Sequence, residues 1–290
     1  MCGKYLFKRF VNDTPNILHT LKINLMWYKY MKVCICGTVK NCGRYLNRVF
    51  KNIEKVGSLF DDYKIVIYYD KSEDNTLQKL HEYKKINSRL YFYVNKAPLS
   101  GFRTQNISRG RNCCLDYIRH NFIDCEMFIM MDLDDVCSKN INTDILKKYL
   151  KREDWDGLSF NTSPNYYDIW ALSIKPYYLS LFAFEQSKQL GNLMAKHIKN
   201  SLDQLKPGDL LPCASAFNGF SIYRTSKFIN CRYDGKLRVD TLPFQKILTT
   251  TYKDYKFINP PDDCEHKAFH LEAINKNNAK IRISPEILFK

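Results

Sequence analysis

Residues 127–136 read MFIMMDLDDV, an apolar run of strand length that ends on three carboxylates. Residues 127–131 are apolar at every position, which is typical of a strand that is buried on both faces of a sheet. Asp132, Asp134 and Asp135 follow at once. At the carboxyl end of such a strand, these acids would lie at the edge of an open α/β sheet, where ligands bind.

The spacing of these three acids points to a bound cation. Carboxylates this close repel one another, and a cation relieves that repulsion. Hard oxygen ligands suit Mg²⁺ or Mn²⁺, and Mg²⁺ is commonly held by one or two carboxylates together with substrate phosphates. The motif therefore predicts a site for Mg²⁺ or Mn²⁺, and the alternative is an Asp-rich turn that only ends the strand.

The segments around the acidic strand alternate between strand and helix patterns. Upstream we expect strands at residues 32–36, 64–69 and 90–94, and helices at residues 44–56, 75–84 and 108–120. Downstream we expect strands at residues 157–160 and 217–223 and a helix at residues 184–205. Strands that alternate with helices indicate a parallel sheet with right-handed crossovers. The predicted fold is one α/β domain in which helices flank a mostly parallel central sheet.

Composition sets limits on the class of protein. The 290 residues are 45% hydrophobic and 14% aromatic, enough for a substantial core, and the net charge of +15 would attract phosphates or other anions. There is no tract of five Lys or Arg residues, so we expect no nucleic-acid arm. Eleven cysteines without a CxxC pair indicate reduced thiols, and we expect a cytoplasmic protein with no transmembrane helix or signal peptide.

Two regions of the chain are expected to differ in character. Residues 1–30 form a basic, aromatic extension that could make at most weak contact with an anionic membrane surface. Residues 31–290 form the domain, with a nucleotide half at residues 31–136 and a more variable half at residues 137–290. The sequence does not indicate an oligomeric state.

Polar residues also follow the first two expected strands. Asp70 comes directly after the second strand, where an acid can accept hydrogen bonds from a ribose or a base edge. Gly37 and Thr38 follow the first strand, and small residues there let a ligand approach the backbone. The alternatives are an ordinary loop at Gly37 and, for the nearby Asp74, a helix cap.

Basic residues gather before the acidic strand. Guanidinium groups bind phosphate through paired hydrogen bonds, and we expect one of Arg103, Arg109 and Arg111 to contact a ligand. Asn112 lies three residues after Arg109, on the same side of the expected helix.

Two further groups of residues in the second half carry possible chemistry. Asp168 lies among aromatic residues in YYDIWA, where rings can stack on sugars or bases and the acid can bind hydroxyls. Asp263, Glu265, His266 and His270 form a late cluster, in which the two histidines at i and i+4 would share one side of a helix. An acid or a histidine here could act as a general base, and imidazole could bind Mn²⁺. The alternatives are a half-buried turn and a solvated helix start.

Taken together, these residues resemble nucleotide-sugar glycosyltransferases of the GT-A fold, from about residue 31 to residue 270. YYDKSEDNT at residues 68–76 is similar to the D-x-S-x-D-x-T segment of family-two-like enzymes. RGRN at residues 109–112 is similar to their A-R-N segment, and MDLDD at residues 131–135 resembles their D-x-D motif. The same arrangement is similar to that of fungal mannosyltransferases of the capsule and mannan type.

The resemblance implies a GT-A (Rossmann-like) fold and a metal-dependent hexosyl transfer. The donor would be a UDP- or GDP-sugar, and the acceptor a hydroxyl of a glycan, a protein or a lipid-linked molecule. The residues that it places near the nucleotide, the diphosphate and the ribose are Gly37, Thr38, Asp70, Arg109, Arg111, Asn112 and Asp132. It places Mg²⁺ or Mn²⁺ on Asp134, with Asp135 assisting.

The late cluster departs from the family pattern and leaves the mechanism open. The acid pair that supplies a base in many relatives is not obvious, so the base could be Asp168, Asp263 or Glu265. His266 or His270 could instead be a further metal ligand, and inversion and retention both remain open. Two other functions are compatible: a sugar-1-phosphate nucleotidyltransferase, whose usual Gly/Arg-rich loop followed by Lys is missing, and a non-catalytic nucleotide- or sugar-binding protein.

Overall fold

The computed structural model describes residues 30–176, 178, 181–237, 256–258 and 260–290. The contacts within the chain separate Met1–Met31 from a compact unit, Lys32–Lys290, which contains all of the elements named below. Except for Tyr30, the expected extension at residues 1–30 lies outside the described residues.

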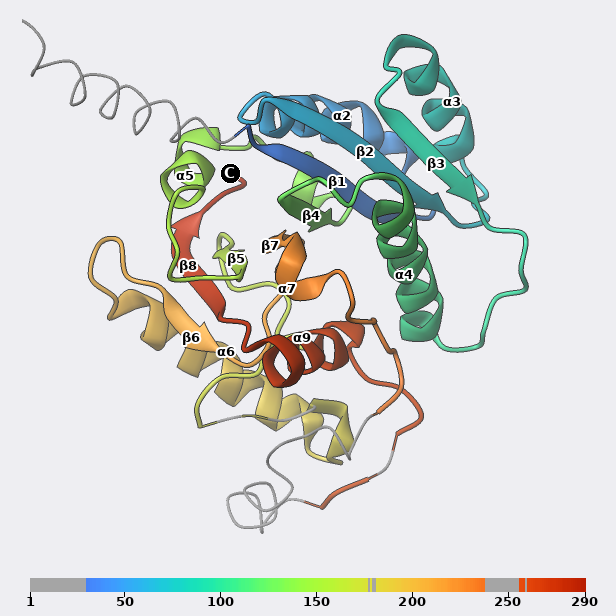
Figure 1. Cartoon of the computed structure of the whole chain (residues 1–290). Coiled ribbons are helices and arrows are strands. Elements are labelled where there is room, and N and C mark those ends of the chain that lie inside the picture. The colour runs from blue at the N-terminus through green and yellow to red at the C-terminus, as the bar shows by residue number, and fades with distance from the viewer. Residues whose placement is uncertain (1–29, 177, 179–180, 238–255, 259) are drawn as a thin grey trace, which may run out of the picture. The chain divides into compact units, whose positions relative to one another are not determined.

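An eight-stranded sheet forms the centre of this unit, in the order β3-β2-β1-β4-β7-β5-β8-β6 (Figure 1). Strands β3, β2, β1 and β4 are parallel to one another, β7 runs antiparallel to β4 and β5, β8 is parallel to β5, and β6 is antiparallel to β8. The strands are β1 (Lys32–Val39), β2 (Asp62–Tyr69), β3 (Leu90–Val94), β4 (Met127–Met131), β5 (Gly157–Asn161), β6 (Leu211–Cys213), β7 (Phe220–Arg224) and β8 (Ile281–Ile287). The predicted α/β fold with a mostly parallel sheet is confirmed.

Helices cover both faces of this sheet. They are α2 (Gly43–Gly57), α3 (Thr76–Ile86), α4 (Arg103–Asn121), α5 (Thr143–Tyr149), α6 (Ser187–Asp203), α7 (Thr225–Phe228) and α9 (Glu265–Asn277), with 3-10 turns η1 (Val136–Ser138) and η2 (Leu181–Ala183). The strand order reverses after β3, so a right-handed connection through α4 returns on the face opposite to α2 and α3. Within the described residues, no helix is both long enough and apolar enough to cross a bilayer.

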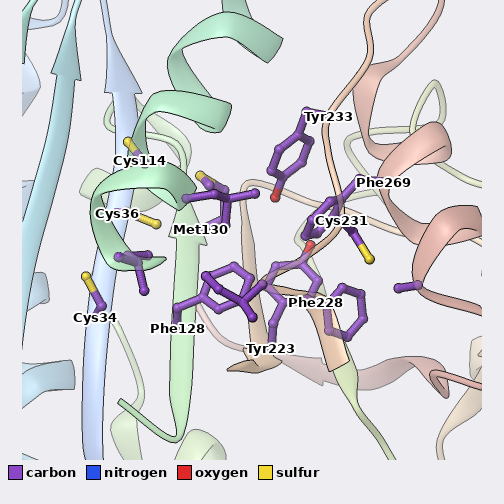
Figure 2. Packing of buried hydrophobic residues seen from close by; sticks show 14 of the residues in the cluster. Cys34, Cys36, Cys114, Phe128, Met130, Tyr223, Phe228, Cys231, Tyr233 and Phe269 are labelled. Atoms are coloured by element: carbon purple, nitrogen blue, oxygen red, sulfur yellow. The ribbon is translucent and has the colours of Figure 1, made fainter. Parts of the chain in front are cut away.

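The core beneath α4 follows from the alternation of side chains along the strands. Cys34 and Cys36 of β1 and Phe128 and Met130 of β4 point to the same face, where Cys114 of α4 packs against them (Figure 2). The same cluster continues into Tyr223, Phe228, Tyr233 and Phe269 of the second half. One core therefore joins the first four strands to β7, α7 and α9. The ten cysteines in the described residues are all free.

Two boundaries differ from the sequence prediction in ways that affect the site. Strand β1 continues to Val39 because it pairs with β2 up to Tyr69, so Gly37 and Thr38 lie in the strand and not in a loop. Helix α4 begins at Arg103, five residues earlier than expected, and so brings its first turn to the same sheet edge. Strand β8 was not predicted, because Pro285 lies inside it and proline argues against a central strand.

Candidate active site

A pocket of about 840 Å³ opens where β1, β2 and β4 end, at the edge predicted from the acidic motif. Seven of the predicted site residues line it: Thr38, Asp70, Arg111, Asp132, Asp134, Asp168 and Glu265. Other parts of the lining come from the segment before and within α4, from residues 167–170 and from η2, and they include Leu99, Ser100, Gly101, Arg103, Asn106, Ile107, Leu181 and Phe182. The lining therefore joins the two halves of the domain.

The end of β2 presents a fixed carboxylate to this pocket. Asp70 is buried, and its Oδ1 accepts hydrogen bonds from the backbone N–H of Lys71 at 3.1 Å and from the side-chain amide of Asn95 at 2.9 Å. Gly37 does not line the pocket. A Cβ at Gly37 would come within 2.3 Å of the carbonyl oxygen of Met131, so this glycine is needed for the close approach of β1 and the end of β4.

The loops beside Asp70 are tied to each other by Asp74. One carboxylate oxygen of Asp74 accepts from the N–H and the hydroxyl of Thr76, and the other accepts from the N–H of Gly43 at 2.9 Å. These bonds satisfy N–H groups at the starts of α3 and α2 together. Within the DxSxDxT-like segment, Asp70 therefore lines the pocket, whereas Asp74 holds the two loops together.

A buried ion network crosses the pocket floor. Arg111 is only 5% exposed, and its Nη2 donates to Asp132 Oδ1 at 3.0 Å while its Nη1 contacts Glu265 and His266. The guanidinium also lies over the Phe217 ring, 4.6 Å from its centroid. Burial acts to lower the pKa of Arg111, but Glu265 and Asp132 outweigh it and raise that pKa. Arg111 is therefore a fixed positive charge that joins β4 to α9.

The other two predicted residues of the RGRN segment do not reach the pocket. Arg109 is exposed, and its guanidinium donates to the carbonyl of Pro98 at 2.8 Å. Asn112 exchanges two hydrogen bonds with the backbone of Tyr233, at 2.8 and 2.9 Å. Arg103, one of the three arginines of which one was expected to contact a ligand, lines the pocket from the first turn of α4.

The carboxylates after β4 lie close together, and one of their oxygens has no partner among the described residues. Oδ1 of Asp134 is buried and has no hydrogen-bond partner among the described residues. Burial and then the neighbouring Asp135 raise the pKa of Asp134. Burial also raises the pKa of Asp132, against the effect of Arg111. Hard cations such as Mg²⁺ are often held by only one or two carboxylates of the protein. The unpaired, buried oxygen of Asp134 and the neighbouring exposed acid Asp135 are suited to be those ligands.

Nitrogen and sulfur ligands do not complete such a site. In the part of the chain that the structure describes, no group of three or more His, Cys, Asp or Glu side chains could hold a metal ion. A cation there would need substrate oxygens to complete its shell, as Mg²⁺ commonly does.

The three candidate bases have different surroundings. Asp168 lies half-buried in the pocket wall, its Oδ1 accepts from the N–H of Ala171 at 3.0 Å, and burial raises its pKa to about 6. Asp263 does not line the pocket and accepts from the indole N–H of Trp170 at 3.1 Å. Glu265 lines the pocket but is paired with Arg111.

The two histidines share one side of α9, as their spacing indicated, and they lie in the core. The His266 ring stacks on Phe217 with centroids 3.8 Å apart, and the ring nitrogens of His270 contact the hydroxyls of Ser215 and Tyr223 at 2.9 and 3.0 Å. Burial lowers the pKa of His266 and brings that of His270 to about 3, so both rings are neutral. Neither histidine lines the pocket.

Comparison with known proteins identifies the class. The model of glycosyl transferase family 2 matches residues 34–198, more than half of the chain. The chain therefore belongs to glycosyl transferase family 2. A search of curated proteins finds no match.

Several solved structures are similar in fold at low sequence identity. TarS of S. aureus is 15% identical, with 89% of this chain and 36% of that chain covered and a TM-score of 0.49. The mannosyltransferase PcManGT of Pyrobaculum calidifontis, solved with GDP-Man and Mn²⁺, is 12% identical, with 93% and 64% covered and a TM-score of 0.43. Mannosyl-3-phosphoglycerate synthase of Rubrobacter xylanophilus is 13% identical, with 74% and 59% covered and a TM-score of 0.41. The chain spans less than two thirds of the length of each.

Proposed function

We propose that this chain is a glycosyltransferase that moves a sugar from a UDP- or GDP-sugar to a hydroxyl, with Mg²⁺ or Mn²⁺ held at Asp134. The observation that carries the proposal is the buried Oδ1 of Asp134, which has no hydrogen-bond partner among the described residues and belongs to a residue lining the pocket. A neutral ligand would leave the repulsion between Asp134 and Asp135 in place, whereas a cation would relieve it.

In this proposal Asp134 holds the cation and the exposed Asp135 assists it. When bound, the cation neutralises charge on the diphosphate as it leaves. The residues described here supply few ligands, so the diphosphate oxygens and water would complete the coordination. Such a site would bind the cation weakly without the donor and tightly with it.

The donor would lie along the ends of β1 and β2. Asp70 is held by Lys71 and Asn95, and its free lone pairs can accept hydrogen bonds from a ribose or a base edge. Thr38 lies beside it in the pocket wall. Arg103 adds an exposed positive charge near Asp134, where a diphosphate would need one.

Of the three candidate bases, we propose Asp168. Asp263 is occupied by the Trp170 indole and Glu265 is occupied by Arg111, so both carboxylates already have partners. Asp168 lines the pocket, and its pKa of about 6 leaves it ionised at neutral pH while keeping it basic enough to accept a proton.

The test is the release of nucleoside diphosphate from UDP- and GDP-sugars in the presence of Mn²⁺. We expect Asp134→Ala and Asp168→Asn each to reduce turnover by at least about 10²-fold, the scale for loss of one group that acts in the transition state. Asp209→Asn, at an exposed acid outside the pocket, is the matched control and should retain wild-type turnover. Turnover that is unchanged in Asp134→Ala would remove the acidic motif from the reaction.

A further inference from the structure

One wall of the pocket is aromatic, and neither donor binding nor cation binding accounts for it. Tyr167, Trp170 and Phe182 line the pocket, and Asp168 lies between the first two in the sequence. The side chains of Tyr167 and Phe182 are 55% and 45% exposed. Large rings that remain exposed in a pocket are typical of a surface that binds another molecule.

Two of the three rings, those of Trp170 and Phe182, are held in place by contacts within the protein. The Trp170 and Phe182 rings meet edge to face at 90°, with centroids 4.7 Å apart. The indole N–H of Trp170 donates to Asp263, a buried carboxylate that also accepts from the N–H of Cys264 and lies 3.5 Å from the Lys267 ammonium. Trp170 also packs against two separate core clusters, so its ring cannot turn freely.

The chemistry around the aromatic wall selects a class of ligand. Asp168 and Glu265 lie in the same lining, and the Asp168 carboxylate has one oxygen without a hydrogen-bond partner among the described residues. An aliphatic chain on this surface would desolvate that carboxylate without a hydrogen bond in return. A pyranose ring has an apolar C–H face for the aromatic rings and hydroxyls at its edge for the carboxylate.

We propose that Tyr167, Trp170 and Phe182 form the acceptor subsite, that its ligand is a pyranose sugar, and that Asp263 is a positioning residue that holds Trp170. This inference rests on the proposed function, because the sugar hydroxyl is placed beside the proposed base. In the reaction the acceptor O–H gives its proton to Asp168 and its oxygen forms a bond to the anomeric carbon. The bond from that carbon to the diphosphate oxygen breaks, and the diphosphate keeps the electron pair.

The experiment separates acceptor binding from donor binding. Release of nucleoside diphosphate from UDP- and GDP-sugars is measured with Mn²⁺, first in water alone and then with the methyl glycosides of glucose, galactose, mannose and N-acetylglucosamine. In the wild type we expect at least one glycoside to increase release. In Trp170→Leu and Phe182→Ala we expect its KM to rise roughly tenfold, from loss of ring stacking. The KM of the donor should change much less than that of the glycoside.

Asp263→Asn tests the positioning role, because its carboxamide can still accept from the indole but loses the charge that faces Lys267. We expect a smaller rise in glycoside KM than in Trp170→Leu, with kcat unchanged, whereas a purely structural role would lower the melting temperature without this split. Ile123→Ala, at a 57% exposed side chain outside the pocket, is the control and should leave every constant unchanged.

Three outcomes would overturn the inference or what it rests on. If no glycoside increases release in the wild type, the subsite does not take a pyranose. If Trp170→Leu and Phe182→Ala leave glycoside KM unchanged, or change donor KM equally, the aromatic wall is not the acceptor subsite. If donor release is absent in the wild type with and without glycosides, the proposed function fails first, and the subsite fails with it.

Discussion

Removal of the Arg111 side-chain charge should strongly destabilise the protein. In Arg111→Met, the half-buried carboxylate of Asp132 and the buried carboxylate of Glu265 lose the cation that they share, and the ring of Phe217 loses its guanidinium neighbour. Removing one partner of a buried ion pair leaves an uncompensated charge and costs about 3–5 kcal/mol. For a domain of this size that corresponds to a fall in melting temperature of about 10 °C.

Urea unfolding of the variant measures this loss directly. Lys199→Met is the matched control, since Lys199 pairs with Asp203 on an exposed helix surface, and it should cost at most about 0.5 kcal/mol. In the double variant Arg111→Met, Glu265→Gln, only one of the two carboxylates is left without its cation. The double variant should therefore lose less stability than the sum of the two single losses, by about 1 kcal/mol or more. A loss in Arg111→Met below about 1 kcal/mol would refute the view that the buried charge of this arginine balances the carboxylates of Asp132 and Glu265.

Three further predictions concern packing, pH and the histidines. Gly110→Ala should cost about 1–3 kcal/mol in urea unfolding and weaken donor binding, because a Cβ there would come within 2.6 Å of Thr38 and 2.7 Å of Tyr68. Turnover should fall about tenfold per pH unit below about pH 6, because Asp168 must lose its proton to act as a base and burial raises its pKa to about 6. A flat pH–rate profile would contradict this role. His270→Ala should lower the free energy of unfolding by roughly 2 kcal/mol or more, because core packing and hydrogen bonds are lost. Donor binding that depends on Mn²⁺ should stay unchanged. A weaker dependence on Mn²⁺ in titration calorimetry would indicate that His270 is a metal ligand.

The sequence predicted those parts of the fold that local patterns determine. The apolar run of β4 and the acids after it correctly indicated both the strand and the sheet edge that carries the pocket. Strand β8 was not predicted for two reasons. Pro285 interrupts its strand pattern, and its partner β5 is far away in the sequence. Long-range pairing of this kind leaves no local trace in the sequence.

The sequence alone does not predict which of the arginines lies in the pocket. Arg109 and Arg111 are two positions apart on a helix, about 200° around its axis, so one faces the core when the other faces solvent. That spacing says that both cannot contact the same ligand, but only the packing of α4 against α9 decides that Arg111 is the buried one. Of the predicted residues in the RGRN segment, only Arg111 lines the pocket, and the roles that the motif assigned to them remain predictions.

The histidines of the late cluster also show that local spacing predicts only part of a residue's position. The i, i+4 spacing correctly placed His266 and His270 on one side of a helix, but spacing cannot tell whether that side meets a pocket or a core. The residues that enclose them, Phe217, Tyr223 and Tyr233, come from distant segments. Their burial with neutral rings is a property of the tertiary structure alone.

The most direct test of the central claim is a thermal-shift measurement with UDP-, GDP- and CMP-sugars, with and without Mn²⁺, on the wild type and Asp134→Ala. A UDP- or GDP-sugar should stabilise the wild type only when Mn²⁺ is present, and Asp134→Ala should abolish the shift. Stabilisation that persists without Mn²⁺, or that is equal in Asp134→Ala, would contradict the cation site. No shift with any donor would contradict the proposed donor class.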